Sequence, residues 1–451
     1  MVGLGKSGRS AIEFCRGQGA TVSVSDSATA KPADAAWLTE KGIASEFGGH
    51  SREFCLAADL ILVSPGVPYD LPIFQEAEEK GIPVIGELAL APRYLKTPVI
   101  AVTGTNGKTT VTTLIGDLLR ASGIKKVFVG GNIGTPLTDY LLSAQEAEWL
   151  VLEVSSFQLD AAGTFRPEIG LLLNLSPDHL DRYASFDDYA YAKLNLFAHQ
   201  QQRDVSITNQ DDPDTVRLTD GMKSLRPGWA ARRCLSFGRR INGRNGAELH
   251  GTTVRVVGDW LRGTDDLYEL KESALCLSPN LENAAAAILA ARAAGCTPAG
   301  IKRGLAAFHP LAHRMTLAAE IDGVRYINDS KATNIGAVQA ALEGMSAPVV
   351  LIAGGRDKGG DYRLMADQVQ AKVKAMLLIG EAKEQMATVF ETMTHVERLE
   401  SMAQAVRRAH ALASPGEVVL LSPACSSFDM FSGYAERGQV FTDLAIGLLQ
   451  R

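Results

Sequence analysis

The run best suited to chemistry is TGTNGKTT, at residues 103–110. It follows a short apolar run and precedes a stretch with helical periodicity, so we predict a strand, a glycine-rich loop and a helix. Such a turn directs backbone N–H groups and the positive helix end at one point, which favours phosphate oxygens. Gly104 and Gly107 let the backbone approach closely. Lys108 can neutralise the β- and γ-phosphates of a nucleotide, and the Thr109 hydroxyl can ligate Mg²⁺.

This loop departs from the full nucleotide-binding pattern GxxxxGK[ST], because Val102 stands where the first glycine is expected. A plain turn between a strand and a helix is therefore the alternative interpretation. We favour phosphate binding, since Gly-Lys-Thr stands in the expected strand–loop–helix context.

Two further polar groups follow predicted strands. Magnesium that bridges phosphates needs hard oxygen ligands, best placed at the carboxyl ends of neighbouring parallel strands. Glu153 ends an apolar run, although a carboxylate there is often only a helix cap. The next such run is followed by NLSPDHLDRY at 174–183, which puts His179 between Asp178 and Asp181. A lone histidine is usually structural, but this setting favours a functional role.

The last third of the chain repeats this arrangement. The sequence NDSKATN, at 328–334, directly follows an apolar strand, and GGRDK, at 354–358, ends the next one. Either could be a solvated loop when taken alone. Together, at successive strand ends, they indicate one edge of a ligand-binding cleft.

The first residues carry a different motif. The run GLGKSG, at 3–8, is a GxGxxG with Asp26 about 20 residues later, which is the dinucleotide fingerprint of an oxidoreductase. The same physics serves any pyrophosphate, including that of a sugar nucleotide. Only Met1 and Val2 precede the motif, so either the true start lies upstream or that edge of the sheet is incomplete.

The elements that position these motifs point to an α/β fold. Apolar runs alternate with helix-periodic stretches, a pattern typical of parallel sheets covered by helices. At 451 residues the chain exceeds a single core, and we predict three domains: 1–87, 88–310 and 311–451. The predicted strands are 20–25, 60–64, 98–103, 149–154, 170–175, 324–328, 348–353, 375–379 and 417–422, and 83–87 leads from the first unit to the second. The predicted helices include 108–121, 186–199 and 281–294, and β-hairpins are predicted over 238–266.

Composition excludes several classes of protein. A net charge of -6 without long like-charge blocks argues against a nucleic-acid partner. The six cysteines form no CxxC pair, which fits reduced thiols in a cytoplasmic protein. No apolar run is long enough to span a membrane, and no signal peptide is evident.

Taken together, these motifs resemble the Mur ligases, nearly from end to end. Asn106, the SFQL run at 156–159 and the DSKATN run at 329–334 look like the member of that family that adds D-glutamate. Relatives that add L-alanine, a diamino acid or a dipeptide carry other residues there. The remaining motifs are 130–134, 178–183, 191–194 and 421–429.

The resemblance implies a Rossmann-like domain for a UDP-sugar, a central P-loop-type ATPase domain and a Rossmann-like domain for the amino acid. The carboxylate of UDP-N-acetylmuramoyl-L-alanine would attack the γ-phosphate of ATP, and the D-glutamate amine would then attack the acyl phosphate. Two Mg²⁺ ions would assist this step of peptidoglycan precursor synthesis. Lys193, an ordinary exposed helix lysine without the resemblance, would be carbamylated and ligate metal. We expect a cytoplasmic monomer.

The resemblance also implies individual roles. The catalytic residues would be Lys108, Glu153, His179 and Lys193. ATP would contact Gly104, Thr105, Asn106, Gly107, Lys108, Thr109, Thr110, Asn283, Arg314 and Asp329. The UDP-sugar would contact Ser7, Asp26, Gly66, Asn132 and His179, and D-glutamate would contact Lys331, Thr333, Lys358, Ser427 and Tyr434. The metal ligands would be Thr109, Glu153, His179 and carbamylated Lys193.

Two positions depart from the family pattern. Pro279 replaces the usual histidine before Asn280, and Tyr434 replaces a more familiar phenylalanine, which keeps the ring and adds a hydroxyl. The alternatives to a D-glutamate-adding Mur ligase are an NAD-dependent oxidoreductase, another amino-acid ligase of the same superfamily, such as a folylpolyglutamate-type enzyme, and a nucleotide-regulated binding protein. An oxidoreductase would leave the Gly-Lys-Thr loop unexplained. Folylpolyglutamate-type ligases lack an N-terminal UDP-binding domain of this kind. A binding protein would give Lys331 and Lys358 no function.

Overall fold

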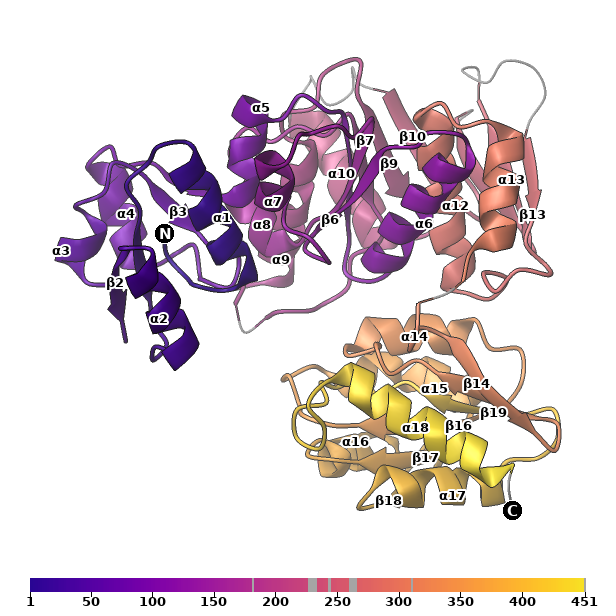
Figure 1. Cartoon of the computed structure of the whole chain (residues 1–451). Coiled ribbons are helices and arrows are strands. Elements are labelled where there is room, and N and C mark those ends of the chain that lie inside the picture. Colours follow the sequence, from indigo (N-terminus) through magenta and orange to yellow (C-terminus); the bar gives the residue numbers. More distant parts are fainter. Residues whose placement is uncertain (181, 226–232, 242–244, 259–265, 310, 450–451) are drawn as a thin grey trace.

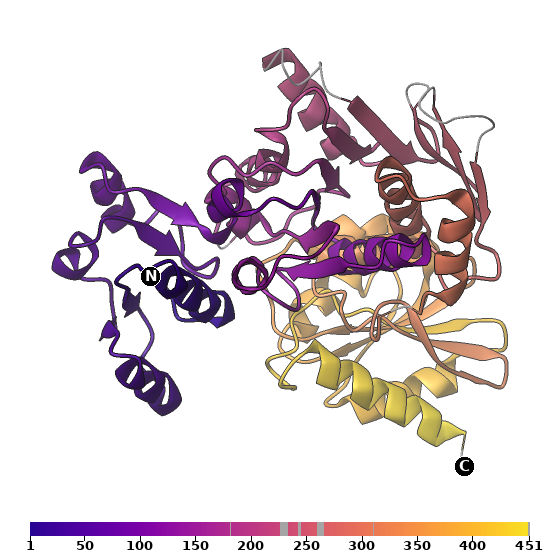
Figure 2. The same cartoon turned by 45° about the horizontal axis from the view of Figure 1, so that its top comes forward.

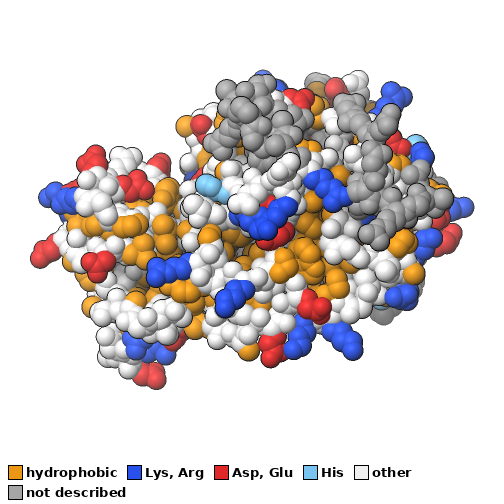
Figure 3. All heavy atoms as spheres, turned by 90° about the horizontal axis from the view of Figure 1, so that it is seen from above, with side chains coloured by type: hydrophobic (Ala, Val, Ile, Leu, Met, Phe, Trp, Pro, Cys, Tyr) orange, Lys and Arg blue, Asp and Glu red, His pale blue; other side chains and the backbone are white. Residues whose placement is uncertain are grey.

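The computed structural model describes residues 1–451 except 181, 226–232, 242–244, 259–265, 310 and 450–451. The chain forms three α/β units in sequence order, and the third packs beneath the central one (Figures 1 and 2). No helix in this described part is long and apolar enough to cross a membrane. Seen from above, blue and red side chains are interspersed over the described surface (Figure 3).

The first unit is a small parallel sheet. Strand β1 (Ser23–Asp26) pairs with β2 (Ala44–Phe47), and β3 (Ile61–Val63) pairs with β4 (Val84–Gly86). Val2 forms parallel bridges to both β1 and β3, so the first residues lie in the middle of this sheet and not at its edge. The helices are α1 (Lys6–Gly17), α2 (Pro32–Glu40), α3 (Arg52–Cys55) and α4 (Pro72–Glu79).

The central unit is built on a nine-stranded sheet with the order β13-β12-β11-β10-β9-β8-β5-β7-β6. Its strands are parallel from β6 to β11, whereas β12 and β13 are antiparallel additions. The strands are β5 (Val99–Thr103), β6 (Val127–Gly131), β7 (Trp149–Glu153), β8 (Ile169–Leu172), β9 (Val205–Asn209), β10 (Arg233–Gly238), β11 (Gly246–His250), β12 (Thr253–Val257) and β13 (Asp266–Glu269).

Helices cover both faces of this sheet. One face carries α6 (Lys108–Ala121), α12 (Asn280–Ala293) and α13 (Pro298–Ala307), which pack on each other and on the strands. The run of buried alanines in α12 allows this close packing. The remaining elements are η1 (Glu87–Leu90), α5 (Ala91–Tyr94), α7 (Leu137–Leu142), α8 (Ser156–Asp160), α9 (Phe186–Leu194), η2 (Asn195–Phe197) and α10 (Pro213–Leu225).

The third unit has a six-stranded sheet with the order β14-β15-β19-β16-β17-β18, parallel except for the edge strand β14. The strands are β14 (Thr316–Ile321), β15 (Val324–Asn328), β16 (Val349–Gly354), β17 (Val373–Ile379), β18 (His395–Arg398) and β19 (Val418–Leu421). The helices are α14 (Ile335–Glu343), η3 (Tyr362–Met365), α15 (Ala366–Lys372), α16 (Lys383–Phe390), α17 (Met402–Leu412) and α18 (Tyr434–Leu448).

The α/β fold is confirmed, and every predicted strand is present within a few residues. The predicted helix 186–199 is shorter than expected, because α9 ends at Leu194 and continues as η2. The predicted strand 170–175 ends early, at Leu172, two residues before Asn174. The hairpins over 238–266 form between β11, β12 and β13, apart from 242–244 and 259–265, which lie outside the described residues.

Candidate functional site

The phosphate loop connects β5 to α6 at the carboxyl edge of the central sheet. Gly104 has φ +146° and Gly107 has φ +85°, conformations that favour glycine. A Cβ at Gly107 would lie 2.2 Å from Oδ1 of Asn283, so α12 closes tightly over the loop. Lys108 Nζ donates to the carbonyl oxygens of Gly104 and Thr105, both at 2.9 Å. The Lys108 ammonium group is therefore already positioned at the loop that would bind phosphate.

Lys193 lies beneath this loop, contrary to its interpretation as an exposed helix lysine. Its side chain is 2% exposed, and Nζ donates to the Gly104 carbonyl at 3.0 Å and lies 4.5 Å from the ring centroid of Tyr189. Burial, and then the charge of Lys108, hold the pKa of Lys193 well below its ordinary value. The neutral amine is thus more accessible in Lys193 than in an exposed lysine.

Glu153 ends β7, beside the phosphate loop. Its Oε1 accepts a hydrogen bond from Asn132 Nδ2 at 2.8 Å, while Oε2 is buried without a partner among the described residues. A buried carboxylate oxygen with no donor fits a cation ligand. The contact also joins a residue predicted to touch the UDP-sugar to one predicted to hold metal.

Three other residues are predicted metal ligands: Thr109, His179 and Lys193. Within the described ranges, no group of three or more His, Cys, Asp and Glu side chains could hold a metal ion. Thr109 Oγ1 accepts a hydrogen bond from Arg314 at 2.9 Å. His179, at φ +54°, packs edge-on against Phe157. Asp181, its second predicted neighbour, lies outside the described residues.

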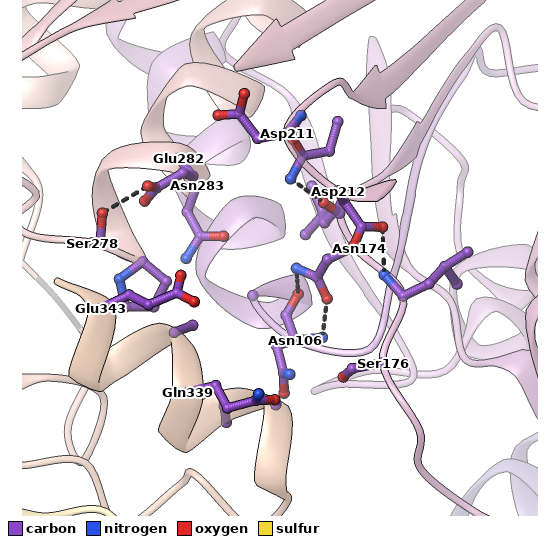
Figure 4. Close-up of a pocket in the computed structure, with 18 of the residues that line it drawn as sticks. Asn106, Asn174, Ser176, Asp211, Asp212, Ser278, Glu282, Asn283, Gln339 and Glu343 are labelled. Atoms are coloured by element: carbon purple, nitrogen blue, oxygen red, sulfur yellow. Dashed lines mark hydrogen bonds between the residues drawn. The ribbon is translucent and has the colours of Figure 1, made fainter. Parts of the chain in front are cut away.

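A cavity of about 730 Å³ opens between the central and third units. Figure 4 shows its central-unit residues facing α14 of the third unit. Seven predicted site residues line it together: Asn106, Gly107, Thr110, Asn283, Arg314, Asp329 and Lys331. Pro279, the departure from the family histidine, lines the same cavity. The volume and the mixture of amides, cations and carboxylates suit a nucleotide.

Asp329 is buried in the wall of this cavity, and the half-buried Arg314 lies near enough for its charge to act on the Asp329 carboxyl. Burial raises the pKa of Asp329 to about 7, although a hydrogen bond from Ser422 and the charge of Arg314 oppose the shift. Burial likewise lowers the pKa of Arg314. Both groups line the cavity, where their charges would face a bound ligand.

The residues predicted to contact D-glutamate are divided. Lys331 Nζ lies 3.7 Å from the centroid of the Tyr434 ring and reaches the cavity, and Lys358 Nζ lies 3.9 Å from Asp178 Oδ1. Thr333 follows Lys331 in the same turn, with its N–H on the Lys331 carbonyl. Ser427 is 2% exposed and does not line the cavity.

Three of the residues predicted to contact the UDP-sugar, Ser7, Asp26 and Gly66, lie in the first unit, whereas Asn132 and His179 belong to the central unit. Asp26 Oδ2 accepts from the backbone N–H of Leu4 at 2.6 Å, which fixes the glycine-rich turn before Ser7. Gly66 is exposed, and Arg182 of the central unit donates to the carbonyls on either side of it, Pro65 and Val67, both at 2.8 Å. The first and central units thus meet at this loop.

Three family models match the chain in the order of its units. They are "Mur ligase MurD-like, N-terminal domain" at residues 1–86, "Mur ligase middle domain" at 102–291 and "Mur ligase, glutamate ligase domain" at 313–425. The chain belongs to the Mur ligase family. The oxidoreductase and binding-protein alternatives are therefore wrong for this Mur ligase.

Curated relatives cover almost the whole of this Mur ligase. A UDP-N-acetylmuramoylalanine--D-glutamate ligase of Desulfosudis oleivorans is 45% identical over 98% of this chain and 94% of the relative. A protein of the same name from Desulfotalea psychrophila is 46% identical over the same shares.

Solved structures of other ligases share the fold. A pseudomurein peptide ligase type C from Methanothermus fervidus has a TM-score of 0.60 at 18% identity, and covers 92% of this chain and 94% of its own. A MurF ligase from Thermotoga maritima, solved in complex with ADP, has a TM-score of 0.59 at 17% identity and covers 100% and 94%. These likenesses confirm the three-domain α/β architecture.

The sequence interpretation missed several residues of the cavity. Asn174 accepts from the Asn106 N–H at 2.8 Å and donates to its carbonyl at 3.1 Å, so it holds the phosphate loop (Figure 4). Asp211 and Asp212 follow β9 and also line the cavity. The strand-end argument would have found them, but the run 205–209 was not recognised as a strand.

Proposed function

We propose that this Mur ligase joins D-glutamate to UDP-N-acetylmuramoyl-L-alanine at the expense of ATP, in cytoplasmic peptidoglycan precursor synthesis. Residues 1–87 would bind the UDP-sugar, 88–310 ATP and 311–451 the amino acid, in a monomer. The observation that carries the proposal is one cavity lined both by the phosphate loop and by Arg314, Asp329 and Lys331. The names of relatives at 41–46% identity supply the amino acid.

The first step transfers the γ-phosphoryl group of ATP to the carboxylate of the UDP-sugar substrate. A carboxylate oxygen attacks phosphorus, the bond to the β-phosphate oxygen breaks and ADP leaves. Because two anions must meet, catalysis depends mainly on fixed positive charge. Lys108 and the N–H groups of the loop at 104–107 provide it, with the phosphates at the start of α6.

Magnesium would supply further charge neutralisation between the phosphates and the carboxylate. The unpartnered Oε2 of Glu153 fits this ion, with the Thr109 hydroxyl and His179 as further predicted ligands. Lys193 cannot ligate a cation as an ammonium group, and its neutral amine is a poor ligand for Mg²⁺, which prefers oxygen. We infer that the neutral amine nitrogen attacks the carbon of CO2, so that an N–C bond forms, one C–O π bond opens and one proton leaves to solvent. The resulting carbamate keeps one N–H and adds a carboxylate-like group whose oxygens can ligate metal.

The second step needs a free amine and a leaving phosphate. The D-glutamate nitrogen attacks the acyl carbon, the carbonyl re-forms and inorganic phosphate departs. Lys331 and Lys358 lie on the side of the third unit that faces the phosphate loop. Their charges would hold the two carboxylates of D-glutamate and leave its amine facing the acyl phosphate.

Phosphate release with ATP, UDP-N-acetylmuramoyl-L-alanine and a panel of amino acids tests the proposal. We expect release to require D-glutamate, and the product mass to equal that of the two substrates less one water. Turnover with L-alanine or a diamino acid in place of D-glutamate would contradict the assigned specificity.

A further inference from the structure

The strongest unassigned contact in the structure joins the phosphate loop to the start of α14. We propose that Asn334 is a positioning residue, which holds the phosphate loop and Asp178 in register with the two lysines of the third unit. This inference rests on the proposed function, because it concerns the transfer of the acyl group between those units. Asn334 itself has no role among the residues expected to touch ATP or D-glutamate.

The contact is a reciprocal pair of side-chain amides. Asn334 Nδ2 donates to Asn106 Oδ1 at 3.1 Å, and Asn106 Nδ2 donates to Asn334 Oδ1 at 3.3 Å. Asn334 Nδ2 also donates to Asp178 Oδ2 at 3.1 Å. One side chain of the third unit therefore touches both the loop after β5 and the loop after β8.

Asn106 is held from the other side, so the pair is not a contact between two mobile side chains. Asn174 binds the N–H and the carbonyl of Asn106 with its own amide, as Figure 4 shows. The backbone of the loop is fixed, and only the Asn106 side chain is left to reach the third unit. Three asparagines thus form one chain of paired amides across the boundary between the units.

The boundary is also tight beside this pair. A Cβ added at Gly336 would lie 2.4 Å from Ser176 Oγ, so the first turn of α14 abuts the loop after β8. Such close approach leaves little freedom for the amides to shift without separating the two units.

The plain alternative is that Asn334 is only a helix cap. Its Oδ1 does accept from the Ala337 N–H at 2.9 Å, as an N-cap should. A serine, threonine or aspartate would do the same, however, because a cap needs only an acceptor. The cap has no use for Nδ2, whose two hydrogen bonds both cross to the central unit.

The crossing bonds act on a charged group near the proposed amino-acid site. Asp178 Oδ1 lies 3.9 Å from Lys358 Nζ, while its Oδ2 is held by Asn334. Asn334 therefore fixes the carboxylate that Lys358 faces. Without the hydrogen bonds of Nδ2, the phosphate loop and Lys358 would no longer be held in a fixed position relative to each other. The amine and the acyl phosphate would then reach a reactive geometry less often.

The test is Asn334→Ser in the full-length enzyme, because serine keeps the cap of α14 but is too short to bridge to Asn106 and Asp178. We expect kcat to fall at least about tenfold, as loss of positioning predicts. The KM for UDP-N-acetylmuramoyl-L-alanine should stay within about twofold, since three of its five proposed contacts, Ser7, Asp26 and Gly66, lie in the first unit. Asn106→Ala should cause a similar loss, and the double variant should be little worse than either single one.

Ser401→Ala is the matched control. Ser401 caps α17 of the same unit through the Gln404 N–H, and it is not part of the cavity lining. Its loss should lower the melting temperature without changing kcat. A wild-type kcat in Asn334→Ser would overturn the inference, and so would a loss of kcat matched by an equal rise in every KM and a lower melting temperature. If the wild type makes no D-glutamyl product, the proposed function fails instead.

Discussion

Lys108 and Lys193 donate to the same oxygen, the carbonyl of Gly104, at 2.9 Å and 3.0 Å. They come from different helices, α6 and α9, and at the phosphate loop Lys193 is buried whereas Lys108 is half-buried. Two ammonium groups on one carbonyl repel each other, and burial disfavours charge on either. The pKa of Lys193 is lowered well below its ordinary value by burial first and by Lys108 second. The neutral amine is the form of lysine that reacts with CO2.

Lys193→Ala should therefore be almost inactive, with a loss of at least about two orders of magnitude in kcat, because the site would lack an anionic group near the phosphates. A short carboxylic acid such as acetate should restore part of the rate by occupying the vacated space. Initial rates measured over a range of acetate concentrations check this expectation. A ¹³C-bicarbonate NMR signal for a carbamate, present in the wild type and absent in the variant, provides a second readout.

Lys302→Ala supplies the control for that experiment, because Lys302 is exposed on α13. Acetate should not change its rate. Full activity of Lys193→Ala would show that the reaction does not need a carbamate on Lys193.

Gly107→Ala should greatly weaken ATP binding. The new Cβ would lie 2.2 Å from Asn283 Oδ1, at a backbone φ of +85° that side chains rarely adopt. Both effects disturb the loop, and strain of this kind amounts to about 1–2 kcal/mol before the collision is counted. We expect the Kd for ATP, measured by calorimetry, to rise by at least about tenfold.

Gly123→Ala is the control that separates backbone strain from the steric clash with Asn283. Gly123 has φ +98°, but a Cβ there meets no atom within 4 Å. That variant should lose stability and bind ATP normally. Equal ATP affinities for the two variants would show that closure of Asn283 over the loop is unimportant.

Glu153→Gln should raise the Mg²⁺ concentration needed for half-maximal activity. Glutamine keeps an oxygen for the Asn132 amide but loses the negative charge that Oε2 offers to a cation. We expect a shift of about 10-fold or more, the usual range for a disturbed metal site. Rates measured in a series of Mg²⁺ concentrations give the value directly.

Glu87→Gln is matched to it, because Glu87 Oε2 is also buried without a partner among the described residues. Its Oε1 accepts from the N–H and hydroxyl of Thr138, at the junction of the first and central units. Burial raises the pKa of Glu87, so a neutral glutamine should be tolerated. A larger Mg²⁺ shift in Glu87→Gln than in Glu153→Gln would contradict the assigned metal ligand.

Asp329 should make stability depend on pH. Its pKa is about 7 in the folded protein and about 3.9 in an unfolded chain, so the folded state holds the proton more tightly. The stabilisation is complete below about pH 4 and is lost as pH rises towards 7, with a slope of up to about 1.4 kcal/mol per pH unit. Asp329→Asn should lack this component.

Denaturant unfolding of the wild type and Asp329→Asn, without nucleotide, measures the difference at each pH. We expect the wild-type free energy of unfolding to fall relative to that of the variant between pH 4 and 7. A constant difference across that range would mean that the carboxylate is ionised throughout.

The functional segments that follow strands were the part of this molecule most readily predicted from the sequence. An apolar run followed by glycine or polar residues located the phosphate loop, Glu153 and the polar cluster after β15, because parallel strands deliver their ends to one edge. β9 and the edge strands β14 and β18 were missed. Their alternating or polar sequences do not stand out, and pairing with neighbours stabilises them.

Burial and contacts between units could not be predicted in the same way. Lys193 is an unremarkable helix lysine in sequence, although its spacing of four from Tyr189 already places both on one face of α9. The pairing of Asn106 with Asn334 joins residues 228 positions apart, and it depends on how the units pack. No local pattern encodes such packing.

The central claim is ligation through an acyl phosphate, and oxygen transfer tests it most directly. UDP-N-acetylmuramoyl-L-alanine labelled with ¹⁸O in its carboxylate would be incubated with ATP, Mg²⁺ and D-glutamate. Mass spectrometry of the released phosphate should then find one ¹⁸O atom per product formed, because the attacking carboxylate oxygen leaves with phosphorus. Unlabelled phosphate, or label in AMP, would contradict the account.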